Sequence, residues 1–146
     1  CLVRDHINMM PEHPLRGKNI DELRPRFVDM SKAYDKEMLN EAVEFAKAND
    51  ILVHQGVYVG LQGPTFETPS EYGLVRFIGG DCVGMSTVPE VIVARHMDMR
   101  VFCLSIITDL GGPEISFDVS HEDVLNAANN AMPNVIRVVK SVIENC

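Results

Sequence analysis

A hydroxyl side chain stands where a short strand is expected to meet a helix. Asp81 to Met85 favours the strand, and Thr87-Val88-Pro89-Glu90 reads as a capping box that would open the helix. Ser86 lies between the two. Because free N–H groups at a helix N-terminus favour negative charge, the Ser86 hydroxyl is a candidate for holding an anion. The alternative is that Ser86 and Thr87 only cap the helix.

Carboxylates and a histidine occupy other ends of expected elements. Asp109 follows Thr108 after Val101 to Ile107, a continuous apolar run typical of a strand buried on both faces. Open α/β sheets bind ligands at strand ends, although an aspartate there is also an ordinary turn residue. Glu67 and His121 stand at the starts of expected helices, where a solvated or capping role is the alternative.

The elements that position these residues include two successive strand–helix units. Val57 to Leu61 predicts a buried strand that ends at the turn Gly63-Pro64. Thr68-Pro69-Ser70-Glu71 is a capping box with proline at the first helical position, and Gly79-Gly80 is expected to stop that helix. Units of this kind place helix N-termini beside strand ends.

The flanking segments follow the same signals. Cys1 to Ile7 and Ile51 to His54 favour strands, and the prolines and glycine of Asn8 to Pro25 predict a long irregular segment. Ser31 is expected to cap a helix that runs to about Ala48.

That helix should bury one face, and a further helix should close the chain. Four residues at helical spacing are expected to line the buried face: Tyr34, Met38, Ala42 and Phe45. Leu110 to Val119 predicts a loop, and Ser120 opens the last helix. Pro133 is expected to kink or interrupt it before it resumes toward Val142. No repeat or linker divides the chain, so we expect one α/β domain.

Composition excludes several classes of function. The 146 residues carry a net charge of −8 and are 46% hydrophobic, which argues for a soluble domain and against nucleic acid or an anionic membrane surface as partner. No apolar run approaches the ~20 residues of a membrane span, and no signal-peptide pattern is visible, so a cytoplasmic location is expected. The five histidines and four cysteines lack ligand spacing, which indicates no metal site, disulfide framework or cysteine nucleophile.

Several motifs together resemble one family. The strings GPTFET and VGMSTVPEVIVARH, with RDHIN, PLRG, MSKAYDK and SHEDVL, are similar to the trimeric purine nucleoside phosphorylases. These enzymes split a nucleoside with phosphate into a free purine and ribose 1-phosphate. The resemblance implies a mixed central sheet flanked by helices, and residues 1–146 as the C-terminal portion of a single domain about twice this long. It implies inorganic phosphate as a co-substrate and no cofactor.

The resemblance also assigns roles to individual residues. Ser86 matches a phosphate contact, and Glu67 matches the carboxylate that hydrogen bonds the N1 side of the purine. The other matches to the substrate-binding set are Tyr58 and Met85 along the ribose, His121 near the 5′-hydroxyl, Phe66 and Val83 on the walls of the base pocket, and Thr108 beside Asp109. Leu23 matches an aromatic residue that covers the ribose of the neighbouring subunit, so a homotrimer is expected; a leucine can cover a sugar but cannot stack on it.

Asp109 departs from the pattern of members that prefer 6-oxopurines, which carry asparagine there. An amide donates to N7 and meets O6, whereas a carboxylate donates only when it is protonated. An ionised Asp109 would accept from a 6-amino group, and an Asp109 whose pKa is raised by burial could act as general acid at N7. The first state would shift preference toward adenosine-like substrates, and the second would serve both base types. We expect acceptance broadened to 6-oxo and 6-amino purines, with Asp109 and Glu67 as the catalytic pair.

Two alternatives remain open at this stage. Methylthioadenosine phosphorylases also carry an aspartate at the place of Asp109, but they generally lack the glutamate at Glu67 and read MTT in place of Met85-Ser86-Thr87. The chain could also be a fragment that binds a nucleoside without turning it over, because the matched family keeps most of its phosphate-binding residues in its other half.

Overall fold

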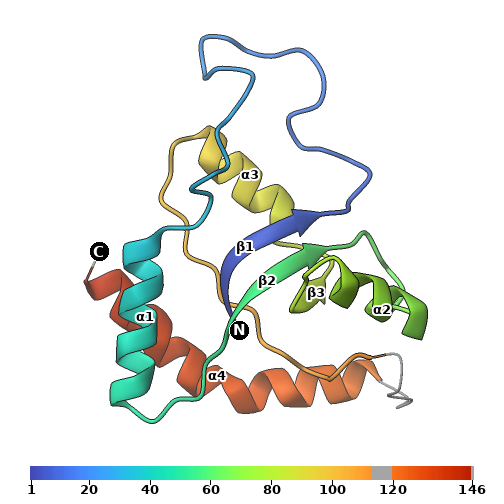
Figure 1. The fold of residues 1–146 in the computed structure, drawn as a ribbon. Helices are drawn as coiled ribbons and strands as arrows, with labels where there is room; N and C mark the ends of the chain where they lie inside the picture. The colour runs from blue at the N-terminus through green and yellow to red at the C-terminus, as the bar shows by residue number, and fades with distance from the viewer. Residues whose placement is uncertain (113–119, 146) are drawn as a thin grey trace.

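The computed structural model describes residues 1–112 and 120–145, and its central element is a small parallel sheet. The strands are β1 (Leu2–Asn8), β2 (Gln55–Gly60) and β3 (Cys82–Gly84), hydrogen bonded in the order β1-β2-β3 (Figure 1). The helices are α1 (Lys36–Ala48), α2 (Pro69–Phe77), α3 (Val88–His96) and α4 (His121–Glu144). The two expected strand–helix units are therefore present, as β2–α2 and β3–α3.

An antiparallel bridge gives the sheet its mixed character. Leu2 pairs with Leu104, and the Val3 amide donates to the Cys103 carbonyl at 3.0 Å. The expected strand from Val101 to Ile107 is wrong as a full element, because among the described residues it makes only this one bridge. A strand needs a continuous ladder with a neighbour, and this segment runs beside only the start of β1. The α/β class with a mixed sheet and flanking helices is confirmed.

Helices cover both faces of the sheet because successive strand residues point to opposite sides. Val3 and Tyr58 belong to a core cluster with Val88 and Val91 of α3. Leu2 belongs to a second cluster, in which it packs with α1 and α4. The same alternation sends Val59 away from Tyr58, toward α2, where it lies with Val75 around Gly80. Strand β2, which carries Tyr58, is therefore buried in the middle of the molecule.

The start of α1 differs from the expectation. Asp35, and not Ser31, is the N-cap: its carboxylate accepts from the Glu37 and Met38 amides at 2.9 and 3.1 Å. The Ser31 hydroxyl is instead engaged by Asp29 at 2.9 Å in the preceding turn. Of the expected buried face, Ala42 is buried within the helix, and Tyr34 is buried just before it.

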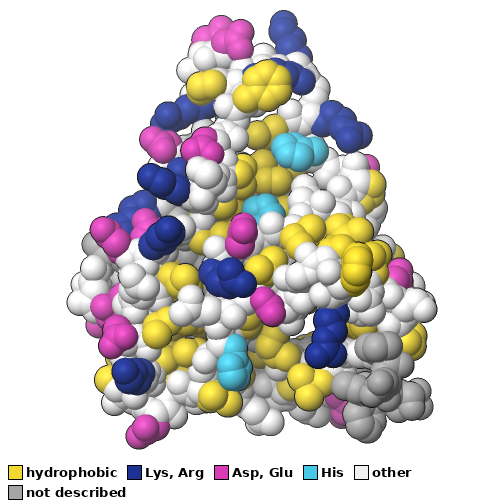
Figure 2. Space-filling view, viewed as in Figure 1, with side chains coloured by type: hydrophobic (Ala, Val, Ile, Leu, Met, Phe, Trp, Pro, Cys, Tyr) yellow, Lys and Arg dark blue, Asp and Glu magenta, His cyan; other side chains and the backbone are white. Residues whose placement is uncertain are grey.

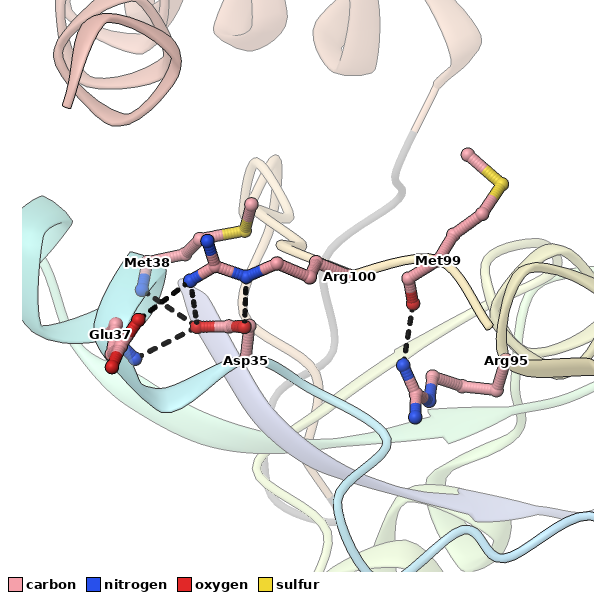
Figure 3. Close-up of polar contacts among 6 residues, drawn as sticks. All are labelled: Asp35, Glu37, Met38, Arg95, Met99 and Arg100. Atoms are coloured by element: carbon pink, nitrogen blue, oxygen red, sulfur yellow. Dashed lines mark hydrogen bonds and ion pairs between the residues drawn. The ribbon is translucent and has the colours of Figure 1, made fainter. Parts of the chain in front are cut away.

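Arg100 ties the start of α1 to the segment that follows α3. Its guanidinium donates to both Asp35 oxygens, at 2.6 and 3.0 Å, and to Glu37 at 2.9 Å (Figure 3). In the same view Arg95 donates to the Met99 carbonyl. The Arg100 hydrogen bond is the main reason that the pKa of Asp35 falls from 3.8 to about 2. Residues 65 positions apart are thus joined by a charge-assisted contact.

Two further boundaries depart from the sequence expectations. The segment from Ile51 to His54 is not a strand, and β2 begins only at Gln55. The last helix begins after Ser120 as expected, with an Asp123–Ser120 capping box, but it continues to Glu144 without interruption at Pro133. The loop expected over Leu110 to Val119 lies, from residue 113 on, outside the described residues.

A long irregular segment projects from the sheet, as the sequence predicts. Residues 9–35 form neither helix nor strand and make the loop at the top of Figure 1. Hydrophobic side chains are exposed on the same projection in Figure 2, and the exposed set includes Ile20, Leu23 and Phe27. No helix among the described residues is long and apolar enough to cross a membrane.

Candidate active site

The loop from β2 to α2 presents Phe66 and Glu67 at the start of a well-capped helix. The Thr68 hydroxyl accepts from the Glu71 amide at 3.3 Å, and the Glu71 carboxylate accepts from the Thr68 amide at 2.7 Å. This expected capping box fixes the direction in which the chain enters α2. Glu67, immediately before the N-cap, is partly buried, and Phe66 is 49% exposed. The two residues therefore border solvent on an ordered helix start.

Tyr72 is the site residue that the sequence analysis missed. Its hydroxyl lies near enough to the Glu67 and Asp109 carboxylates for both to act on it electrostatically. Burial is the first cause, and these two acids are the next, of the rise in the pKa of Tyr72 to about 12. The sequence does hold a signal for it. Around the Thr68 N-cap, Glu67 and Tyr72 occupy the two positions that pack together in a hydrophobic staple.

Asp109 approaches Tyr72 from a segment that lies much later in the sequence. The Thr108 hydroxyl donates to one Asp109 carboxylate oxygen at 2.9 Å, and both residues are partly buried. Gly111 then packs directly against the Tyr72 ring, since a Cβ at that position would overlap the ring carbons. The two predicted acids, 42 positions apart in number, thus both lie near one phenol.

A second group of predicted residues gathers where β2 and β3 end. Tyr58 on β2 is 2% exposed, and its hydroxyl lies against Gly84 and accepts from the Ser86 amide at 3.4 Å. A side chain at Gly84 would collide with that hydroxyl, so glycine is needed there. Val83 pairs with Val59 in the parallel register and is partly buried.

Met85 links this second group to the loop that carries Glu67. Its side chain lies against Gly63, in the turn between β2 and α2, and is 40% exposed. Met85 thus contacts the first part of this loop, and Glu67 lies near the end of the loop. Both groups of predicted residues border the same connection.

At the start of α3 the expected capping box is wrong, and the Ser86 hydroxyl is accessible as the anion prediction requires. Ser86 is exposed and directly precedes Thr87, with the two hydroxyl oxygens 3.2 Å apart. Thr87 is the N-cap residue, but its side chain makes no capping hydrogen bond in the described structure, so the expected box with Glu90 does not form. Its φ of 72° lies in the left-handed region, which disfavours a β-branched residue and is a form of strain found at functional sites.

Leu23 and His121 stand apart from these groups. Leu23 is 66% exposed on the projecting loop, and His121 is exposed at the first position of α4. Within the described residues neither forms a hydrogen bond or ion pair with another predicted site residue. The contacts predicted for them are to a ribose and a neighbouring subunit, which a single chain does not hold.

Two open depressions on the surface lie elsewhere. One is lined by residues around Asp35 and Arg100 and the other by residues around Glu41 and Asn145. Neither includes a predicted site residue. Among the described residues, no group of three or more His, Cys, Asp and Glu side chains is arranged to hold a metal ion.

Comparison with known sequences supplies relatives over almost the whole chain. The family model of the phosphorylase superfamily matches residues 1–144. Purine nucleoside phosphorylase 1 of Geobacillus stearothermophilus is 41% identical over 144 residues, which are 99% of this chain and 53% of that protein. The chain therefore spans about half the length of the curated relatives it matches.

Solved structures give the same likeness in three dimensions. The Schistosoma mansoni purine nucleoside phosphorylase in complex with inosine superposes with a TM-score of 0.91 at 35% identity, covering 99% of this chain and 54% of that one. The same enzyme in complex with adenosine gives a TM-score of 0.90 at 36% identity, covering 98% and 54%. The sequence match and the shared fold together establish that this chain belongs to the phosphorylase superfamily.

Proposed function

We propose that residues 1–146 are the C-terminal portion of a single-domain purine nucleoside phosphorylase. The observation that carries the proposal is that Glu67 and the segment of Asp109 both lie at Tyr72, whose ring packs against Gly111, since these two acids match the residues that bind the base in that family. The identity to the Geobacillus stearothermophilus enzyme supports the same activity. Phosphate is a co-substrate in this proposal, and no cofactor takes part.

The reaction replaces a carbon–nitrogen bond by a carbon–oxygen bond. A phosphate oxygen bonds to the anomeric carbon as the bond from that carbon to the purine breaks, and the electron pair leaves with the purine. The sugar becomes cationic on the way, so negative groups on both sides stabilise the transition state. The purine gains one proton, from Asp109 where that carboxyl is protonated and from water otherwise.

The proposed anion site is the start of α3. Ser86 supplies an exposed hydroxyl, and the Thr87 side chain leaves the first amide groups of the described helix without a capping acceptor from that residue. Helix N-terminal amides favour negative charge. Phosphate held there would lie beside the Tyr58 hydroxyl, which the Ser86 amide contacts.

The remaining predicted residues are proposed to hold the sugar and the base. Tyr58 and Met85 would line the ribose, and His121 would approach its 5′-hydroxyl. Phe66, Val83 and Thr108 would border the base with Glu67 and Asp109. The partial exposure of Phe66 and Met85 supports this, because apolar groups that cover a ligand must face solvent before it binds.

Asp109 is proposed to broaden acceptance to 6-aminopurines. Its carboxylate already accepts from Thr108, and a 6-amino group would be a second donor to it. The Schistosoma mansoni relative has been solved with both inosine and adenosine, which supports acceptance of both base types in a protein of this likeness.

The quaternary proposal is a cytosolic homotrimer in which Leu23 covers the ribose of the neighbouring subunit. Support comes from the projecting segment, where Ile20, Leu23 and Phe27 are 58%, 66% and 89% exposed. Large apolar side chains gathered on an exposed projection are typical of a surface that binds a partner.

The direct test is phosphorolysis by the full-length protein. We expect phosphate-dependent release of hypoxanthine from inosine, with ribose 1-phosphate formed in equal amount, and little or no turnover by residues 1–146 alone. A full-length protein that releases no purine from inosine or adenosine would contradict the proposal. Turnover by the 146 residues would show instead that the other half of the relatives is dispensable.

A further inference from the structure

Tyr72 sits where the geometry of a helix start forces contact with Glu67. Thr68 is the N-cap of α2, so Glu67 is the residue before the cap and Tyr72 is the fourth residue of the helix. These two positions pack together when the chain enters a helix through a capping box. Here they carry a carboxylate and a phenol in place of two apolar groups, so the phenol is placed to donate to the carboxylate.

The other side of the Tyr72 ring is fixed by the segment that carries Asp109. Gly111 lies flat against the ring, and any larger residue there would have to displace it. Asp109, two residues earlier, accepts from the Thr108 hydroxyl at 2.9 Å. One phenol is therefore packed between two segments, each of which presents one acid.

The phenol has one proton to give and two acceptors near it. Its hydroxyl remains protonated at neutral pH, because burial and the two carboxylates raise the pKa of Tyr72 to about 12. It can therefore act as a donor toward the Glu67 or the Asp109 carboxylate. Donation to Glu67 would fix the orientation of that carboxylate.

We propose that Tyr72 is a positioning residue that holds Glu67 as an oriented acceptor and so sets the preference between 6-oxo and 6-amino purines. The inference rests on the proposed function. A 6-oxopurine carries a proton on N1, which the Glu67 carboxylate can accept, whereas N1 of a 6-aminopurine is itself an acceptor. Tyr72 thus favours the 6-oxo base at Glu67, while Asp109 favours the 6-amino group.

The test is Tyr72→Phe in the full-length protein, assayed with inosine and with adenosine. We expect kcat/KM for inosine to fall about tenfold, mainly through KM, because a hydrogen bond to a charged group is lost. The value for adenosine should change less than about twofold, and KM for phosphate should stay the same. The inosine-to-adenosine ratio is the readout, since a general loss of structure lowers both values together.

Two further variants sharpen the result. Gly111→Ala pushes the ring away without touching either acid, and it should lower the same ratio. Tyr34→Phe is the matched control, because it removes a phenol hydroxyl that bonds His6 at 2.9 Å and should leave the ratio unchanged. In a Glu67→Gln background, the effect of Tyr72→Phe on inosine should shrink to less than about twofold, because the two residues act as one unit.

The outcomes separate this inference from the proposed function. A ratio that stays at the wild-type value in both Tyr72→Phe and Gly111→Ala overturns the role of Tyr72, and so does an equal loss on both nucleosides. A wild-type protein that cleaves neither nucleoside overturns the proposed function instead.

Discussion

At the scale of single residues, Asp109 would decide what the proposed base site can recognise. A carboxylate accepts hydrogen bonds where an asparagine amide would both donate and accept. Thr108 already donates to one of its oxygens, so the other oxygen is the one available to a ligand. The chemical consequence is a bias toward donors, and a 6-amino group is a donor.

Asp109→Asn is expected to move the substrate preference toward inosine. The amide can donate to N7, and the 6-amino group loses its carboxylate acceptor, so kcat/KM for inosine should rise relative to adenosine by about tenfold. Turnover of both nucleosides by the full-length protein measures the ratio, and Asp98→Asn is a surface control. An unchanged ratio would end the idea that Asp109 broadens acceptance.

Ser86 can be tested without disturbing its neighbours. Its backbone amide, not its hydroxyl, contacts Tyr58, so Ser86→Ala keeps that contact and removes only the group proposed to bind phosphate. We expect KM for phosphate to rise about tenfold while KM for the nucleoside changes little. Initial rates at varied phosphate concentration provide the measurement. A rise in KM for the nucleoside alone would place Ser86 on the sugar instead.

At the scale of elements, the cap of α1 carries both helix and tertiary stability. Asp35 accepts two helix amides and binds Arg100, so one carboxylate fixes the helix start and the segment after α3. Loss of an N-cap alone costs about 0.5–2 kcal/mol. Asp35→Ala should therefore lower the free energy of unfolding by about 1–2 kcal/mol, measured by urea unfolding at neutral pH.

The same carboxylate predicts a loss of stability in acid. The pKa of Asp35 is lowered from 3.8 to about 2, so its contribution is complete above pH 3.8 and disappears as the pH falls toward 2. Asp35→Asn keeps a capping side chain without the charge, and its unfolding free energy should depend less on pH in this window. An Asn variant with the same acid dependence as the wild type would show that other carboxylates dominate.

Local signals in the sequence predict elements well where they act alone. The capping box at Thr68 places the start of α2, because both of its hydrogen bonds are between residues three positions apart. The same pattern at Thr87 fails, since the residue takes a φ of 72°. Ser31 fails as a cap because a nearer acid, Asp29, engages it. Which side chain caps a helix therefore depends on the folded structure as well as on the local sequence.

Contacts between distant segments could not be predicted from the local sequence patterns. The run from Val101 to Ile107 looks like a buried strand, yet its pairing depends on how much of β1 lies beside it. Pro133 looks like a break, yet α4 continues through it and buries Val138 and Val142 against Leu2 and α1. The helix start alone places Tyr72 beside Glu67, but the approach of Gly111 and Asp109 from a distant segment cannot be predicted from that local pattern.

At the scale of the whole molecule, Leu23 raises the question of whether the site is shared between subunits. It is 66% exposed on the segment of residues 9–35, and within the described structure no other predicted site residue bonds to it. A residue carried by such a projection covers a ligand either in its own subunit or in a neighbour. In a closed ring of three subunits, the second case combines Leu23 of one chain with Glu67 of the next.

Mixing two impaired variants distinguishes these cases. Leu23→Asp should raise KM for the nucleoside, because a charge replaces the apolar cover, and Glu67→Gln should impair base binding. When the two variants are co-expressed in equal amounts, a shared site recovers roughly a quarter of wild-type activity, since one site in four draws both intact residues from different subunits. Separately purified trimers that are mixed without subunit exchange serve as the control. No recovery after co-expression would mean that Leu23 acts within its own chain, or that the chains do not assemble as proposed.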